Sequence, residues 1–126
     1  MKKKIVNAIS APAPIGPYSQ AVIAGKFLFG SGQIAINSVT GQLVTSDIET
    51  ETRQVMQNIE AILLEAGMNF GNIIKTTIFL KDMNNFAKVN EIYGSYFSGD
   101  FPARETVEVS RLPKDVNVEI SVIAAE

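Results

Sequence analysis

The chain has 126 residues, of which 46% are hydrophobic and 19% are charged, and its formal net charge at pH 7 is −2. These values suit one compact domain over residues 1–126, exclude a disordered chain, and disfavour a nucleic-acid-binding protein, which needs clustered Lys and Arg. The sequence contains no Cys and no His, which excludes disulfides, the usual zinc sites and the Ser-His-Asp triad, so any catalysis must use other groups.

The N-terminal basic run, Lys2 to Lys4, is interpreted as a solvated terminus. It resembles the start of a secretory signal, but Asn, Ser and Pro interrupt the segment that follows, where a signal needs an apolar run. The chain also lacks the apolar stretch of about 20 residues that a membrane span requires. We therefore expect a cytoplasmic protein.

Three short strands are predicted at residues 3–6, 19–24 and 27–33. The segment ISAPAPIGP between the first two cannot be helical, because proline lacks the backbone N–H and crowds the preceding turn. After the third strand, the turn NSVTGQL contains Gly41, which is the residue expected to adopt a positive φ.

A first helix is predicted over residues 47–66. Ser46 and Glu49 have the spacing of a capping box, and Gly67 is placed to end the helix in a left-handed conformation. One apolar stripe recurs at spacings of three and four: Val55, Ile59, Ile62, Leu63 and Ala66. The carboxylates of this helix are interpreted as its solvated polar face and not as a metal site: Glu49, Glu51, Glu60 and Glu65.

The second half of the chain predicts a buried strand at residues 73–81, a second helix capped by Asp82, and two final strands, 103–111 and 116–124, joined by the turn LPKD. Gly99 and Pro102 are expected to end the second helix, whose apolar face is Phe86, Val89, Tyr93, Tyr96 and Phe97.

The order of elements, β-β-β-α-β-α-β-β, predicts an α+β domain with two helices packed on one face of a mixed sheet. Such a sheet leaves its other face open to water. The sheet is rich in Val and Ile, and the last strand places Ile123 among its polar positions. We therefore expect self-association to cover that face.

The segment GSGQIA, residues 30–35, has the spacing of a dinucleotide-binding loop. The context contradicts that function, because a Rossmann loop opens directly into a helix and here a turn follows. The glycines more simply allow close approach of a ligand or a neighbouring strand, with Ser31 and the local N–H groups as donors.

Arg104 and Glu119 are charged residues in or beside strands that are otherwise apolar or hydroxylated. An unpaired charge there would be costly to bury. Two interpretations stay open: a structural ion pair, or a site in which the arginine fork binds a carboxylate while the glutamate handles water or a proton. Tyr18, after the GP turn, could add an aromatic wall and a hydroxyl.

With these residues assembled, the chain resembles the YjgF/RidA family of reactive-intermediate deaminases over essentially its whole length. The most specific motif is P-A-R followed by L-P and V-E-I. The matching stretches are IGPYSQA at 15–21, SGQIAIN with TG at 31–41, NIEAILLEAG at 58–67, IIKTTIFLKDMNNFAKVNEIY at 73–93 and FPARETVEVSRLPKDVNVEISVIA at 101–124.

The resemblance implies a chorismate-mutase-like fold, a homotrimer, and sites in clefts between subunits. It also implies a deaminase that hydrolyses 2-iminobutanoate and 2-iminopropanoate, the imines and enamines released by pyridoxal-phosphate enzymes such as threonine dehydratase, to 2-oxo acids and ammonia. No cofactor and no metal are expected, and the partners are small imino acids, with neither nucleic acid nor membrane.

Carried over residue by residue, the family's carboxylate-binding arginine falls on Arg104 and its water-associated glutamate on Glu119. The substrate-binding positions fall on Tyr18, Ser31, Gly32, Asn90 and Thr106.

Many members of the family have a small residue and then a cysteine after the arginine, where this chain has Glu105 and Thr106. Because the family's pocket is thought to use the backbone at the cysteine position, Thr106 is expected to preserve activity. Glu105 is the residue expected to shift the preference among imino acids.

Other functions fit the same residues. A non-enzymatic trimer that binds small carboxylates, for metabolite sensing or as a chaperone, would use the same arginine. A ribonuclease or translation inhibitor, also described for this family, is disfavoured by the acidic charge balance and the absence of histidine.

Overall fold

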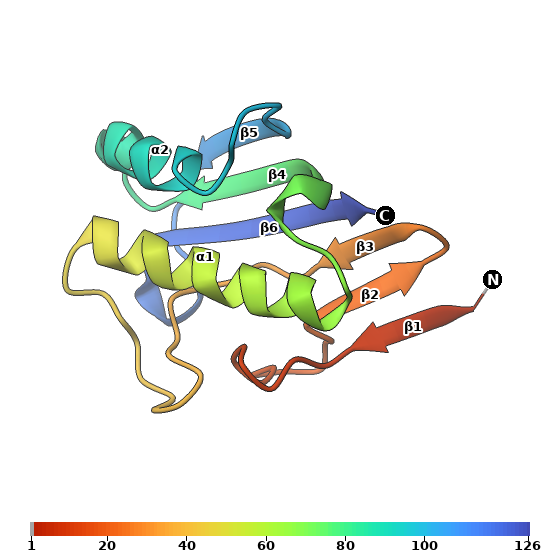
Figure 1. The fold of residues 1–126 in the computed structure, drawn as a ribbon. Helices are drawn as coiled ribbons and strands as arrows, with labels where there is room; N and C mark the ends of the chain where they lie inside the picture. The colour runs from red at the N-terminus through yellow and green to blue at the C-terminus, as the bar shows by residue number, and fades with distance from the viewer. Residues whose placement is uncertain (1) are drawn as a thin grey trace.

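The computed structural model describes residues 2–126, which form one mixed sheet of six strands (Figure 1). In spatial order the strands are β1 (Lys3–Val6), β2 (Ala21–Ala24), β3 (Phe27–Gly30), β6 (Val118–Ala125), β4 (Ile73–Leu80) and β5 (Ala103–Glu108). Only the β4–β5 pair is parallel, and the other neighbours within residues 2–126 are antiparallel.

Two helices, α1 (Ile48–Glu65) and α2 (Phe86–Gly94), lie on the same face of this sheet (Figure 1). Short 3-10 turns at Phe70–Asn72, Met83–Asn85 and Pro113–Asp115 complete the chain. The predicted α+β architecture and the predicted order of its helices and strands are therefore confirmed. None of the helices formed by residues 2–126 combines the length and the hydropathy that a membrane-spanning helix requires.

The core lies between the helices and the sheet, where apolar side chains lose contact with water and stabilise the fold. Its largest members come from α1 and from the central strands, and include Leu28, Val55, Met56, Leu63, Ile78, Leu80, Val118 and Ile120. The stripe predicted on the first helix supplies the α1 part of this core.

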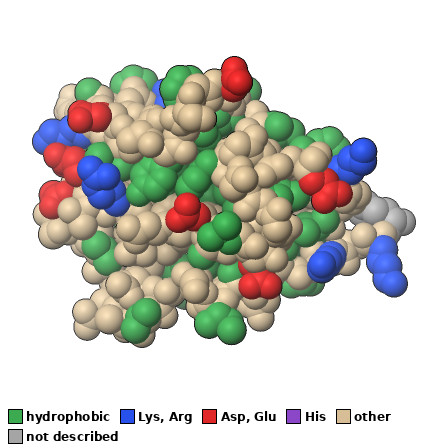
Figure 2. Space-filling view, viewed as in Figure 1, with side chains coloured by type: hydrophobic (Ala, Val, Ile, Leu, Met, Phe, Trp, Pro, Cys, Tyr) green, Lys and Arg blue, Asp and Glu red, His purple; other side chains and the backbone are tan. Residues whose placement is uncertain are grey.

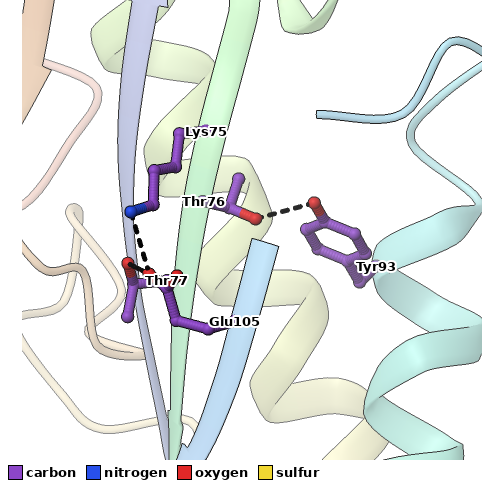
Figure 3. A network of polar contacts seen from close by, with 5 residues as sticks. All are labelled: Lys75, Thr76, Thr77, Tyr93 and Glu105. Atoms are coloured by element: carbon purple, nitrogen blue, oxygen red, sulfur yellow. Dashed lines mark hydrogen bonds and ion pairs between the residues drawn. The ribbon is translucent and has the colours of Figure 1, made fainter. Parts of the chain in front are cut away.

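Alternation along the strands assigns each side chain to one of two faces. On β4, Thr76 points to the helices and bonds Tyr93 of α2, whereas Lys75 and Thr77 point to the open face (Figure 3). Arg104 is paired with Thr76 across β4 and β5, so it lies on the helix face. Glu119 is paired with Phe79 across β4 and β6, so it lies on the open face.

The open face carries exposed aromatic side chains. Phe27 and Phe29 of β3 are 45% and 48% exposed, and they pair with Ala125 and Ile123 of β6. Large apolar side chains exposed on a sheet face commonly mark an interaction surface. That this face is covered by further copies of the chain stays a prediction.

The helix boundaries differ in part from the prediction. Asp47, not Ser46, caps α1, because its carboxylate accepts a hydrogen bond from the Thr50 backbone N–H at 2.7 Å. This bond and one from the Thr50 hydroxyl lower the pKa of Asp47. The positive φ angles predicted for Gly41 and Gly67 are confirmed, at 72° and 74°.

The second helix ends earlier than predicted, at Gly94. Tyr96 and Phe97 lie beyond it and stack against Phe70, with ring centroids 5.3 and 5.8 Å apart. Their apolar spacing therefore reflects a separate aromatic cluster and not a longer helix. Asp82 caps the 3-10 turn that leads into α2, since its carboxylate accepts a bond from the Asn84 N–H.

The strand boundaries differ as well: β2 and β6 begin two residues later than predicted, and β3 and β5 end three residues earlier. The third strand ends at Gly30: the Ser31 N–H still donates to Gln20 O just before β2, and beyond it Gln33 pairs with Ile120 as an isolated bridge. The fifth ends at Glu108, because its partner β4 ends at Leu80. A strand cannot extend beyond the neighbour that supplies its hydrogen bonds.

The prediction that Glu51 lies on the solvated face of the first helix is wrong, because this side chain is fully buried. Its carboxylate accepts bonds from the backbone N–H groups of Asn117 and Val118 and from the Asn117 side chain. These three donors replace the water that a buried carboxylate loses.

Candidate functional site

The predicted site residues fall into two pockets. One, of about 470 Å³, lies between α2 and β5 on the helix side of the sheet; we call it the arginine pocket, lined by Asn90, Tyr93, Gly94, Phe101, Pro102 and Arg104. The other, of about 380 Å³, we call the glutamate pocket, lined by Ile15, Tyr18, Ser31, Gly32, Ile34, Pro113 and Glu119.

Arg104 is held from one side by helix α2. Its Nη1 donates a 2.7 Å hydrogen bond to Asn90 Oδ1, and its Cζ lies 5.2 and 5.7 Å from the ring centroids of Tyr93 and Phe86. A guanidinium group at these distances is attracted by the aromatic faces. Of its five N–H donors, only this one makes a recorded hydrogen bond within residues 2–126.

Tyr93 forms the floor of the arginine pocket and is itself fixed by β4. Its hydroxyl lies 2.8 Å from Thr76 Oγ1 (Figure 3). Burial raises the pKa of Tyr93, against the opposing effects of the Thr76 hydrogen bond and the Arg104 charge. The ring therefore stays neutral and presents a rigid face to the guanidinium.

Helical spacing explains why these residues meet. Asn90, Tyr93 and Gly94 are three and four positions apart on α2, so they share one side of the helix. Sequence reasoning identified Asn90 but assigned Tyr93 to the core, and it missed Phe86 and Phe101 as neighbours of the arginine. The i, i+3, i+4 relation to Asn90 was the signal that could have identified Tyr93.

Glu119 in the glutamate pocket lies directly against the backbone of Gly32. A Cβ added at Gly32 would overlap Glu119 Oε2 and lie 2.7 Å from its Cδ. Only glycine allows this approach. The side chain of Glu119 is half-buried, and burial raises the pKa of its carboxyl.

Ser31 and Tyr18 both form hydrogen bonds with backbone groups of nearby residues. The Ser31 hydroxyl donates to Ser19 O at 2.6 Å and its N–H donates to Gln20 O, so both of its donors are used. The Tyr18 hydroxyl accepts a bond from the Ile15 N–H at 3.2 Å and keeps its own proton available. These bonds fix the shape of the pocket wall beside Glu119.

Arg104 and Glu119 do not meet within one chain, because they lie on opposite faces of the sheet. The interpretation as an intrachain ion pair is therefore wrong. The two pockets are separate in the single chain, one with a cationic fork and one with a carboxylate. A guanidinium can bind a small carboxylate and a carboxylate can orient a water molecule, but in a single chain these two groups lie in different pockets.

The two residues after Arg104 point to opposite faces. Thr106 shares the helix face with Arg104, and its hydroxyl is buried without a hydrogen-bond partner within residues 2–126. Glu105 points to the open face, where it accepts a 2.7 Å bond from Thr77 and lies 3.3 Å from Lys75 (Figure 3). These contacts, the Thr77 bond first, lower the pKa of Glu105.

The described residues offer no obvious metal centre. Within residues 2–126 no group of three or more Asp and Glu side chains is arranged so that it could hold an ion.

Comparisons with known proteins agree with this architecture. The family model described as Endoribonuclease L-PSP matches residues 8–126. A RutC family protein of Pyrococcus horikoshii is 57% identical over 122 residues, covering 97% of each chain. The 2-iminobutanoate/2-iminopropanoate deaminase of Mus musculus is 44% identical over 124 residues, covering 98% of this chain and 92% of the mouse protein.

Among solved structures, the crystal structure of E. coli TdcF with bound serine superposes with a TM-score of 0.94 at 42% identity. It covers 98% of each chain. The match of the family model over nearly the whole chain, together with these relatives, shows that the protein belongs to the YjgF/RidA family.

Proposed function

We propose that the protein is an imine deaminase that hydrolyses 2-iminobutanoate and 2-iminopropanoate to 2-oxo acids and ammonia. The observation that carries the proposal is the guanidinium of Arg104, which Asn90 and Tyr93 hold in an open pocket. Its other N–H groups remain able to donate hydrogen bonds to a ligand. Such a fork suits a small carboxylate. The mouse relative is named for this activity, and TdcF was crystallised with serine, a small amino acid.

The proposed site forms between subunits of a homotrimer. Arg104 of one subunit would face the glutamate pocket of its neighbour, because Arg104 and Glu119 of one chain lie on opposite faces of its sheet. The exposed Phe27 and Phe29 support burial of the open face by another copy. Assembly would thereby complete the site.

In the proposed mechanism, Arg104 binds the substrate carboxylate and orients C2 toward a water beside Glu119. The carboxylate of Glu119 accepts a proton as the water oxygen bonds to C2, and the C=N double bond becomes a C–N single bond. Starting from the protonated imine, Glu119 then returns that proton to the nitrogen and the C–N bond breaks with release of ammonia. The hydroxyl on C2 loses its proton to the Glu119 carboxylate as the C=O bond of the 2-oxo acid forms. Burial raises the pKa of Glu119, which makes it a better base than a solvated glutamate.

The test couples threonine dehydratase and threonine to this protein, and follows decay of the imine and formation of 2-oxobutanoate. Arg104→Ala is expected to lower kcat/KM by at least about 100-fold, because positioning of the reacting groups is lost. Arg53→Ala, which changes an exposed arginine on α1, is the matched control and should behave as wild type.

Light scattering on both variants reports assembly. A trimeric wild type that accelerates no imine hydrolysis, with threonine or serine as the source, would refute the deaminase. An Arg104→Ala protein that loses its assembly instead of its turnover would show that the arginine is structural.

A second candidate is a trimer that binds small carboxylates without turnover, favoured by the serine bound to TdcF. Isothermal titration with serine and 2-oxobutanoate, beside the turnover assay, separates the two functions. Binding that needs Arg104 without any catalysis would establish the second.

An RNA substrate, which the description of the family model suggests, has less support. Figure 2 shows Lys and Arg scattered among acidic and apolar side chains on the face that carries the helices, without a continuous basic patch on that face. Binding of an RNA phosphate backbone would need such clustering.

A further inference from the structure

Glu51 is a fully buried carboxylate in the first turn of α1 that the proposed mechanism does not use. Its Oε2 accepts the N–H of Asn117 at 2.7 Å and that of Val118 at 3.2 Å, while Oε1 accepts Asn117 Nδ2 at 2.8 Å. Within residues 2–126 the recorded ion pairs are Lys75–Glu105 and Arg111–Asp115, and neither involves Glu51. Two backbone N–H groups and one side-chain amide therefore satisfy its oxygens.

The residues that Glu51 holds lie between two walls of the glutamate pocket. Pro113, which lines the pocket, begins a 3-10 turn, and Glu119 follows Val118 directly. Within that turn, Lys114 and Asp115 adopt positive φ angles of 56° and 55°. Two consecutive non-glycine residues in this conformation are strained and persist only where the surroundings hold them.

The turn is held from both sides. On the solvent side, Arg111 donates two hydrogen bonds to the Asp115 carboxylate, at 2.8 and 3.2 Å. On the inside, Val116 and Val118 are fully buried, and Glu51 binds the two N–H groups that follow Val116. The exposed Arg111 pair is open to water and weak, so the buried carboxylate is the stronger restraint.

We propose that Glu51 is a positioning residue for the imine hydrolysis proposed above: by holding Asn117 and Val118, it fixes the carboxylate of Glu119 against Gly32. The inference rests on the proposed function for its kinetic test. Glu51 itself does not contact the substrate, so substrate affinity and the rate of water attack depend on different residues. Substrate affinity depends on Arg104, and the rate of water attack depends on the α1 to β6 connection.

The experiment perturbs this connection from the β6 side and then repairs it. Asn117→Asp places a second carboxylate where Asn117 Nδ2 donates to Glu51. Adding Glu51→Gln restores a donor and acceptor pair, because the glutamine Nε2 can donate to the carboxylate introduced at position 117 while its oxygen accepts both backbone N–H groups. Glu51→Ala removes all three bonds, and Glu60→Ala on the exposed side of α1 is its matched control.

Asn117→Asp and Glu51→Ala are expected to lower kcat about tenfold with KM within about twofold of wild type, because Arg104 still holds the substrate. The double variant should recover kcat to within about threefold, and Glu60→Ala should match wild type. The carboxyl of Glu119, followed by ¹³C NMR, should titrate at a lower pH in the impaired variants than in wild type, because a displaced side chain gains water.

Several outcomes would overturn the inference. One is a fall in thermal stability in Asn117→Asp with kcat, KM and the Glu119 titration unchanged. Another is an impaired double variant that folds as wild type. If Glu51→Ala does not fold, the Asn117→Asp pair still decides. If the wild type hydrolyses no imine, the proposed function fails, and the Glu119 titration alone then supports or overturns the positioning role.

Discussion

The arginine pocket and the glutamate pocket are built in different ways. The arginine pocket is lined by residues of helix α2, of the edge strand β5 and of the segment just before β5. Its central residue, Arg104, is exposed in the single chain and held by Asn90 and two aromatic rings. The residues that line the glutamate pocket lie, apart from Glu119 of β6, in irregular segments and a 3-10 turn. Buried polar side chains hold the backbone of neighbouring segments.

Three buried polar residues perform this task, each for a different segment that lies next to the lining of the glutamate pocket in the chain. Gln20 bonds the backbone of Ala8, Ala11 and Pro12 at the base of the Pro-rich segment. Asn58 donates to the carbonyls of Ile34 and Ile36, at 3.1 and 3.0 Å. Glu51 holds the start of β6.

The difference predicts how each pocket responds to change. Irregular backbone needs buried partners for its N–H and C=O groups. Substitution of a buried polar residue outside the glutamate pocket should therefore shift the backbone that it holds, and with it the pocket. The arginine pocket depends on direct contacts between side chains, so it should respond mainly to substitution of those side chains. Substitutions in and around the glutamate pocket test this contrast.

The largest effect is expected for Glu119→Gln, which keeps the shape of the side chain and removes its charge. We expect kcat to fall about 100-fold at neutral pH, because the water loses its proton acceptor. Removing a partly buried charge should at the same time raise the midpoint of thermal unfolding, since burial disfavours the ionised form. Turnover near wild type in this variant would eliminate the role of the charge.

The pH profile sharpens this prediction. In the proposed mechanism the active form of Glu119 is ionised, and burial raises its pKa above the ordinary value of 4.5. Activity should therefore fall as the pH is lowered through that raised pKa, and Glu119→Gln should lose this acid limb. A wild-type profile that stays flat down to about pH 4.5, the ordinary value for a glutamate, would contradict a proton transfer to Glu119.

A smaller effect is expected for Gly32→Ala. The new methyl group would overlap the Glu119 carboxylate, which must swing away from its position. We expect kcat to fall about tenfold with KM nearly unchanged, because the carboxylate of the substrate still binds Arg104. A Gly32→Ala protein with wild-type kcat would show that Glu119 need not lie against this backbone, and the contrast between the pockets would fail.

The sequence predicted the fold better than it predicted the site. The apolar periods of α1 and of the strands identified these elements, because burial is what selects those residues. Periodicity could not show that Glu51 is buried, since a carboxylate on a helix is usually solvated and its three donors lie 66 and 67 residues away. Tertiary contact alone determines its environment.

The same limit applied to Arg104 and Glu119. Each stood out as a charge in an apolar strand, but whether they share a face depends on the register of β4 with both β5 and β6. That register is a property of the assembled sheet. The expected roles, carboxylate binding for Arg104 and water association for Glu119, came from the resemblance to a known family. The structure shows that the two residues lie on opposite faces of the sheet in one chain.

The smallest effect is expected for Glu105→Ser, which tests the sequence-based prediction that Glu105 shifts the preference among imino acids. Its side chain lies on the face opposite Arg104 and bonds Thr77, next to Lys75. The ratio of kcat/KM for imines derived from threonine and from serine should therefore change less than about twofold, because specificity follows contacts in the pocket. A larger change would mean that Glu105 contacts the substrate bound at a neighbouring subunit. The substrate would then lie against the open face, close to Lys75.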